Sequence, residues 1–152
     1  MNALERTLGL IKPDAVQAGH IGKILDHILM RGFRIVGMRM LRLSRTAAEN
    51  FYFMHRGRPF FESLIDFITS GPLVAFVLER EGAVHAYREL MGATDPAKAA
   101  PGTLRALFGT NVERNAVHGS DSPESARREI AFFFSEMELM FPLVEQKIPA
   151  EL

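Results

Sequence analysis

Cysteine is absent from this chain of 152 residues. Its absence excludes disulfide bonds, thiolate nucleophiles and cysteine-ligated zinc. Acidic and basic side chains balance at 18 each, which gives a formal net charge of +0 at pH 7. There is therefore no overall basic field that would attract nucleic acid or an anionic membrane. A balanced net charge does not exclude a local basic pocket.

Long apolar segments are also missing. The longest apolar run, residues 73–78, suits a buried strand and is too short to cross a bilayer. The N-terminal residues lack the apolar core of a secretory signal peptide, so we expect no membrane association and a cytoplasmic location. The length and the hydrophobic content of 47% fit one domain with a sizeable core, which we assign to residues 1–152.

Strand-like and helix-like patterns interleave along the chain. Strands are predicted at residues 7–11, 33–43 and 73–79, and helices at residues 21–31, 46–55, 60–68, 83–91, 103–107 and 123–134. Two N-caps are open for the second of these helices: Ser44, or Thr46 in a capping box with Glu49. The interleaving favours an α/β or α+β fold in which helices cover a sheet, with the strand order left open.

His118 lies in the segment 115–122, Asn-Ala-Val-His-Gly-Ser-Asp-Ser, just ahead of a predicted helix. Ser122 is the expected N-cap and Pro123 the first helical residue. A helix N-terminus favours phosphate, and an imidazole is largely neutral and nucleophilic near pH 7. The pattern fits a histidine that attacks a phosphoryl group, while a lone histidine is more often a structural residue.

Three further side chains each admit two interpretations. Lys12 precedes Pro13 at the end of a predicted strand, where it is either a positioned ammonium or an ordinary solvated lysine. Phe60 follows a break in the helical pattern and faces either a cleft or the core. Glu129 borders the apolar face of the last helix, so it is either partly buried and turned toward the His118 segment or a surface acid.

Taken together, the segments resemble the nucleoside diphosphate kinases. The resemblance runs from about Arg6 to Phe134, and its motifs keep the family's order and spacing. They are residues 7–15 (TLGLIKPDA), 58–61 (RPFF), 70–72 (SGP), 91–96 (MGATDP), 101–105 (PGTLR) and 115–122 (NAVHGSDS), the last being highly specific to the family. The resemblance implies a ferredoxin-like α/β sandwich with a four-stranded antiparallel sheet covered by helices.

The resemblance also implies an activity: reversible transfer of the γ-phosphoryl group from a nucleoside triphosphate, mainly ATP, to a nucleoside diphosphate. The reaction would be ping-pong, would pass through a phosphohistidine on His118, and would maintain NTP and dNTP pools. Glu129 would hold the unreacting ring nitrogen, with Ser120 in support. A nucleotide-binding role is implied for Lys12, Tyr52, Phe60, Leu64, Arg88, Thr94, Arg105, Val112 and Asn115.

Within that set, the cations and Thr94 would bind phosphate, and Asn115 with Lys12 would contact the sugar. Phe60 would stack on the base. Mg²⁺ would be bound through the nucleotide phosphates, with no protein ligand of its own.

Two parts of the chain depart from the family pattern. Leu107 stands where the family usually has an acid, from which we predict reduced stability or altered subunit contacts without loss of activity. The tail, residues 135–152, should pack on its own domain or on a neighbouring subunit. The family implies a homo-oligomer, and the length of the tail favours a hexamer over a tetramer.

Three other functions fit the sequence less well than the enzyme does. A nucleotide-binding or regulatory module on the same fold would not need the full set of cations around His118. A nucleic-acid-binding protein gains no support from the neutral net charge. A purely structural protein would need neither the histidine nor the cations.

Overall fold

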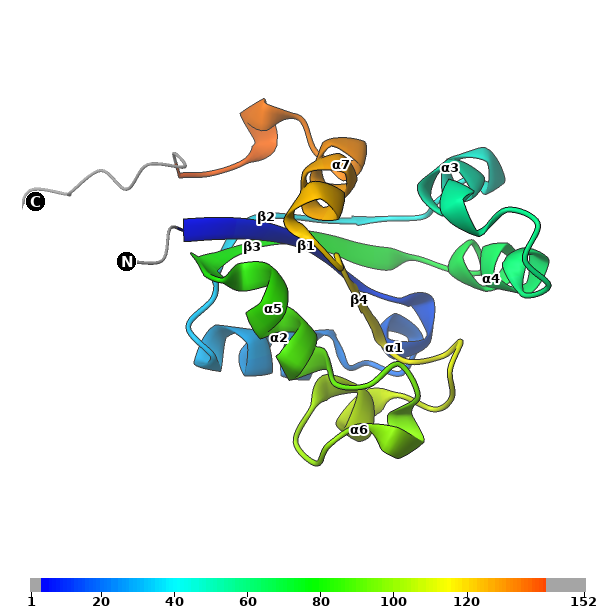
Figure 1. Cartoon of the computed structure of the whole chain (residues 1–152), viewed down its shortest axis with the longest axis horizontal. Coiled ribbons are helices and arrows are strands. Elements are labelled where there is room, and N and C mark those ends of the chain that lie inside the picture. The colour runs from blue at the N-terminus through cyan, green and yellow to red at the C-terminus, as the bar shows by residue number, and fades with distance from the viewer. Residues whose placement is uncertain (1–3, 142–152) are drawn as a thin grey trace, which may run out of the picture.

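A four-stranded antiparallel sheet with the strand order β2-β3-β1-β4 forms the centre of the molecule (Figure 1). The computed structural model describes residues 4–141. The strands are β1 (Leu4–Ile11), β2 (Arg34–Leu41), β3 (Leu73–Glu81) and β4 (Val117–Gly119). The ferredoxin-like sandwich expected from the sequence is confirmed.

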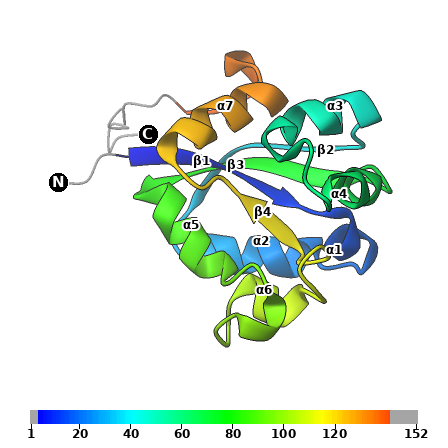
Figure 2. The same cartoon turned by 45° about the vertical axis from the view of Figure 1, so that its right-hand side comes forward.

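Helices cover both faces of this sheet. They are α1 (Pro13–Gln17), α2 (Ile21–Met30), α3 (Arg45–Phe51), α4 (Phe61–Ile68), α5 (Ala83–Met91), α6 (Leu104–Phe108) and α7 (Pro123–Phe133). Figures 1 and 2 show α2 and α5 on one face and α7 on the other. None of the helices between residues 4 and 141 has the length and hydropathy needed to cross a membrane.

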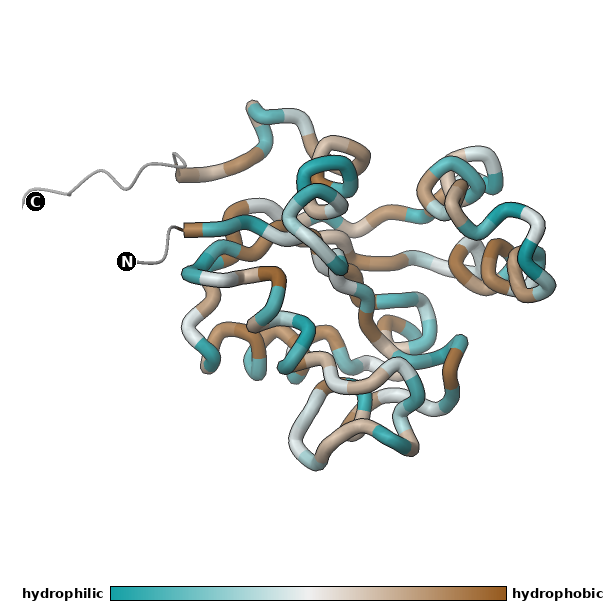
Figure 3. The backbone as a smooth tube through the Cα atoms, viewed as in Figure 1, coloured by the Kyte–Doolittle hydropathy of each residue, from teal (hydrophilic) through white to brown (hydrophobic). Residues whose placement is uncertain are grey.

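Two buried apolar clusters, one on each face, hold these layers together. Ile24 and Ile28 of α2 pack with Phe76 of β3 on one face, and Phe133 of α7 packs with Leu8 of β1 on the other. In Figure 3 hydrophobic and hydrophilic residues alternate along α2, as expected of an amphipathic helix. Residues 7–11 of β1 and 73–79 of β3 are buried, and burial on both sides of the sheet explains the continuous apolar run at residues 73–78 of β3.

The N-terminus of α3 corrects one detail of the sequence analysis. Ser44 has an extended backbone, and its side chain accepts a hydrogen bond from the N–H of Ala47 at 3.1 Å. The helix therefore starts at Arg45, and Thr46 lies inside its first turn. The capping box of Thr46 with Glu49 was wrong; Glu49 instead pairs with Arg45 at 3.2 Å.

The helix expected to extend from residue 46 to residue 55 was also too long. α3 ends at Phe51, and a short 3₁₀ turn follows at Phe53–His55. In the opposite direction, the short helix α1 that begins at Pro13 was not predicted. Met54 and His55 of the 3₁₀ turn and Lys12, the N-cap of α1, line the pocket described below.

The described part of the tail lies against its own sheet. The N–H of Met140 donates to the carbonyl of Val36 on β2 at 2.7 Å, and Leu139 joins the cluster beneath α7. Arg6 of β1 donates to the carbonyl of Phe141 at 2.7 Å. Residues 142–152 lie outside the described residues, so the prediction for that part stays a prediction.

Candidate active site

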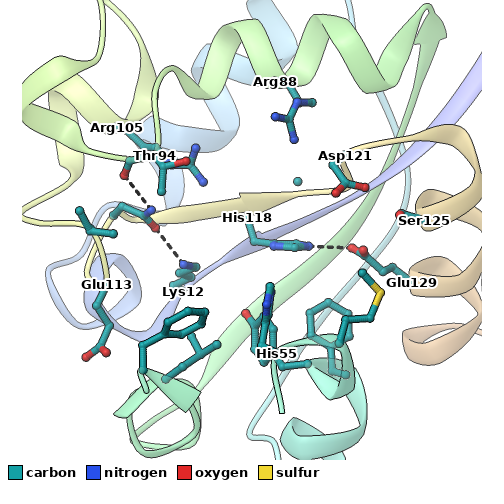
Figure 4. Close-up of a pocket in the computed structure, with 18 of the residues that line it drawn as sticks. Lys12, His55, Arg88, Thr94, Arg105, Glu113, His118, Asp121, Ser125 and Glu129 are labelled. Carbon is teal, nitrogen blue, oxygen red and sulfur yellow. Dashed lines mark hydrogen bonds and ion pairs between the residues drawn. The ribbon is translucent and has the colours of Figure 1, made fainter. Parts of the chain in front are cut away.

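A cavity of about 620 Å³ opens between the sheet edge at β4, the α3–α4 hairpin and the start of α7. Eleven of the twelve site residues expected from the sequence line it: Lys12, Tyr52, Phe60, Leu64, Arg88, Thr94, Arg105, Val112, Asn115, His118 and Glu129. Figure 4 shows His118 in the middle of the cavity, with Lys12 and Arg88 on different sides of it. Ser120 does not line the cavity, but its hydroxyl donates a hydrogen bond to Glu129, which does.

His118 is held by a carboxylate. Its Nε2 lies 2.7 Å from Oε1 of Glu129, and the hydroxyl of Ser120 donates to the same oxygen at 3.1 Å. Glu129 is only 8% exposed. It is therefore a buried partner of His118 and not a surface acid. A neutral imidazole facing this carboxylate keeps its proton on Nε2, which leaves the lone pair of Nδ1 for reaction.

Aromatic rings restrict the imidazole from the side of α3. The Phe51 ring lies edge-on to His118 with centroids 5.4 Å apart, and the Tyr52 ring lies at 6.4 Å. On β4, His118 pairs in antiparallel register with Leu10 of β1. The strand therefore fixes the backbone of the histidine, while Phe51 and Glu129 limit the rotation of its ring.

Lys12 provides a buried cation at the base of the cavity. Its Nζ donates to Oδ1 of Asn115 at 2.8 Å, and Nδ2 of Asn115 donates to the carbonyl of Thr94 at 3.0 Å. The pKa of Lys12 is lowered to about 8, mainly by burial and also by the nearby charge of Arg105, while the charges of Asp14 and Glu113 partly oppose this. The site thus holds an ammonium whose charge is most stable when an anion binds.

Two arginines complete the positive wall. Arg105 donates to the carbonyl of Gly92 and to that of Val117, each at 3.0 Å, so both ends of its guanidinium are fixed. Burial lowers the pKa of Arg105, which the nearby Arg88 also lowers. The buried Nε of Arg105 has no hydrogen-bond partner within residues 4–141. This arrangement suits a multiply charged anion such as a polyphosphate.

An apolar slot lies at the mouth of the cavity. Phe60 is 48% exposed and Val112 is 58% exposed, and Leu64 lines the same cavity. Solvent-exposed rings of this kind are typical stacking surfaces for a flat heterocycle. Of the two interpretations of Phe60, the exposure of its ring supports the one in which it faces a cleft.

Several lining residues were not assigned a site role from the sequence: Phe51, Met54, His55, Glu113, Asp121, Ser125 and Arg128. Position in the chain offered a signal for some of them. Asp121 belongs to the 115–122 segment, and Arg128 directly precedes Glu129. Glu113 and Met54 lie in segments without a chemical pattern, and only the fold brings them to the cavity.

The described residues supply no ready-made metal centre. No group of three or more His, Asp or Glu side chains could hold an ion between residues 4 and 141. A divalent cation at this site would need the oxygens of a bound nucleotide as ligands. The donor set therefore fits Mg²⁺ carried by substrate better than a resident metal.

Comparison with known proteins identifies the family. The sequence model described as nucleoside diphosphate kinase matches residues 5–139. The chain belongs to the nucleoside diphosphate kinase family. Among its relatives, the nucleoside diphosphate kinase of Pelotomaculum thermopropionicum is 57% identical over 90% of this chain and 92% of the relative. That of Geobacter sulfurreducens is 55% identical over 90% and 100%.

Solved nucleoside diphosphate kinases share the fold. The Aquifex aeolicus enzyme superposes with a TM-score of 0.89 at 50% identity, over 91% of this chain and 100% of that one. The Halobacterium salinarum enzyme in complex with CDP gives a TM-score of 0.87 at 42% identity, over 97% and 95%. The protein is thus an enzyme, a nucleoside diphosphate kinase that transfers phosphoryl groups between nucleotides.

Proposed function

We propose that the chain works by a ping-pong mechanism in which His118 carries the phosphoryl group. The observation that supports this most directly is the 2.7 Å contact between Nε2 of His118 and Glu129, which leaves the lone pair of Nδ1 available for attack. Nδ1 attacks the γ-phosphorus of a nucleoside triphosphate, a P–N bond forms, and the P–O bond to the diphosphate breaks. The departing diphosphate takes the bonding electron pair.

The second half-reaction is the reverse with another nucleotide. A β-phosphate oxygen of the acceptor diphosphate attacks phosphorus, and the electron pair of the P–N bond returns to Nδ1. A phosphoramidate suits this exchange because it is comparable in energy to the phosphoanhydrides on either side. A serine phosphate would be a trap.

Positioning and charge neutralisation provide the catalysis. Lys12, Arg88 and Arg105 face the transferred group, where charge spreads over the phosphoryl oxygens. The imidazole becomes positively charged as Nδ1 reacts, and Glu129 stabilises that charge through the Nε2 proton. Mg²⁺ bound to the nucleotide phosphates supplies further neutralisation, and the described residues need only leave room for it.

Substrate binding follows from the rest of the cavity. The Halobacterium relative was solved in complex with CDP, which supports nucleotide binding by this chain. We propose that the base lies on Phe60 and the sugar at Asn115, which both line the cavity. Stacking does not read base edges, so we propose broad base tolerance and a role in maintaining NTP and dNTP pools. A homo-oligomer, with a hexamer favoured over a tetramer, and the cytoplasmic location remain predictions.

The half-reaction tests this function. Protein is mixed with ATP and Mg²⁺ without acceptor, its intact mass is measured, and GDP is then added. One acid-labile phosphoryl group per chain is expected, absent from His118→Ala and lost to GDP as GTP forms. A wild-type chain that turns over nucleotide without ever gaining this mass would rule out the phosphohistidine.

A further inference from the structure

Ala116 has a backbone conformation that alanine rarely adopts. Its φ is 73°, and its side chain is fully buried at 0% exposure. The N–H of Val117 donates to the carbonyl of Asn115 at 2.9 Å, which closes a three-residue turn around Ala116. Turns of this type with positive φ are strained, and such strain persists only where the surroundings hold it.

Residues at the start of α1 hold this turn. The carboxylate Oδ2 of Asp14 accepts a hydrogen bond from the N–H of Ala116 at 3.0 Å. The N–H of Lys12 donates to the carbonyl of Ala116 at 2.8 Å. Both backbone polar groups of Ala116 are therefore paired with the segment 12–14, and Asp14 is the only one of these partners that acts through a side chain.

The turn joins the functional groups of the site. Asn115 precedes it and binds the ammonium of Lys12, whereas His118 follows it by two residues on β4. Arg105 donates to the carbonyl of Val117, the residue between the turn and His118. A change in the turn would thus alter the distances between the histidine and the groups that bind nucleotide.

Asp14 also acts on Lys12 through its charge. The groups that influence the ammonium are Arg105 from α6, Asp14 from α1 and Glu113 from the loop before β4. Burial and Arg105 lower the pKa of Lys12, and among the opposing groups Asp14 has the larger effect. Without Asp14, the pKa of Lys12 would fall below its value of about 8.

We propose that Asp14 is a positioning residue of the phosphoryl-transfer site, whose carboxylate holds the strained turn at Ala116 between Asn115 and His118. The consequence for catalysis rests on the function proposed above. The turn and the charge of Lys12 can each be measured without any turnover.

Two substitutions separate the two roles. Asp14→Asn keeps an oxygen that can accept from the N–H of Ala116 but removes the charge, whereas Asp14→Ala removes both. Asp26→Asn is the matched control, because Asp26 is an exposed acid on α2 that does not line the cavity.

The first readout is the titration of Lys12, followed by NMR with lysine labelled with carbon-13 at Cε. The midpoint should move to lower pH in Asp14→Asn and stay unchanged in Asp26→Asn. The second is amide hydrogen exchange at Ala116, which should accelerate in Asp14→Ala and change little in Asp14→Asn. An unchanged Lys12 midpoint in Asp14→Asn would overturn the charge role.

Kinetics complete the test. We expect kcat/KM near neutral pH to fall by about tenfold or more in Asp14→Ala, because a small misplacement of reacting groups is costly. In Asp14→Asn the alkaline limb of kcat/KM should move to lower pH, an effect that a purely structural residue would not produce. If Asp14→Ala does not fold, Asp14→Asn still decides through the Lys12 titration and the pH profile.

The two proposals can fail separately. A wild-type chain without a phosphohistidine would refute the proposed function, while the Lys12 titration and Ala116 exchange would still test Asp14. Conversely, an Asp14→Ala protein with kcat/KM within about twofold of wild type and unchanged Ala116 exchange would overturn the positioning role, with the phosphohistidine intact.

Discussion

Nε2 of His118 lies 2.7 Å from Oε1 of Glu129, so a strand of three residues and a helix of eleven meet at one hydrogen bond. The buried hydroxyl of Ser120 donates to the same oxygen. Because Glu129 holds the proton on Nε2, the nitrogen left with a free lone pair is Nδ1. Neighbours that orient a reactive histidine in this way can be changed without touching the nucleotide.

Replacing Glu129 should slow phosphoryl transfer without abolishing it. In Glu129→Gln the neutral amide cannot stabilise the imidazolium that forms during attack, and we expect a loss of about 10–100-fold in the rate of His118 phosphorylation. Ser120→Ala should cost less, because it removes only a supporting hydrogen bond. Rapid-quench measurement of the phosphoenzyme would show this, and a Glu129→Gln rate equal to wild type would contradict it.

Nucleotide affinity should depend on pH through Lys12. The pKa of about 8 means that the ammonium is present below that pH and is lost above it, so diphosphate binding should weaken as pH rises through 8. Lys12→Met should bind weakly throughout and lose this dependence. Calorimetric titration at several pH values tests the prediction, which fails if the variant retains the wild-type pH profile.

Lys12 also affects stability, in the opposite direction. Its folded pKa of about 8 lies below the ordinary value of 10.5, so the unfolded chain binds more protons between these two values. The contribution of Lys12 to the free energy of unfolding should therefore rise with pH across this window. Urea unfolding of wild type and Lys12→Met would reveal it as a pH-dependent difference between the two, and a constant difference would refute it.

Removing the ring of Phe60 should weaken the binding of all nucleotides to a similar extent. Base stacking contributes about 1–3 kcal/mol per base, so KM should rise about tenfold for purine and pyrimidine substrates in Phe60→Ala. Because Phe60 is 48% exposed, the free energy of unfolding should change by no more than about 0.5 kcal/mol. Met137→Ala, at an exposed position outside the cavity, is the control. A loss confined to one base would indicate edge recognition instead.

The exposure of Leu107 bears on its two predicted effects, reduced stability and altered subunit contacts. It is 49% exposed near the end of α6, so its replacement should change the folding stability of a single chain little. We therefore expect Leu107→Asp to alter subunit association more than unfolding, with activity retained. Light scattering over a dilution series and thermal unfolding would separate the two. A large change in unfolding with an unchanged assembly would support the stability explanation.

Local patterns explain how much could be predicted. The apolar spacing that starts at Ile21 and the Ser122–Pro123 helix start depend on neighbouring residues, and both helices were found from sequence. Ser44 and Thr46 both fit as caps locally, and only the structure selects Ser44. Periodicity placed Glu129 on the border of the apolar helix face, so its burial could not be predicted from sequence.

The site itself depended on resemblance to the family. Lys12 and Asn115 are separated by 103 residues, and no local pattern indicates that they share a hydrogen bond. The turn at Ala116 was equally hidden, because nothing in the residue types requires positive φ there. Family motifs carried this long-range information, which composition and periodicity do not contain.

The pairing of β1 with β4 joins two segments that lie far apart in the sequence, since Leu10 lies opposite His118. Contacts so distant in sequence require the closure of a long loop, which is slow compared with local helix formation. His118 therefore cannot take its place beside Lys12 until this long-range pairing has formed. In refolding experiments, recovered activity would report the completion of folding, later than helix content does.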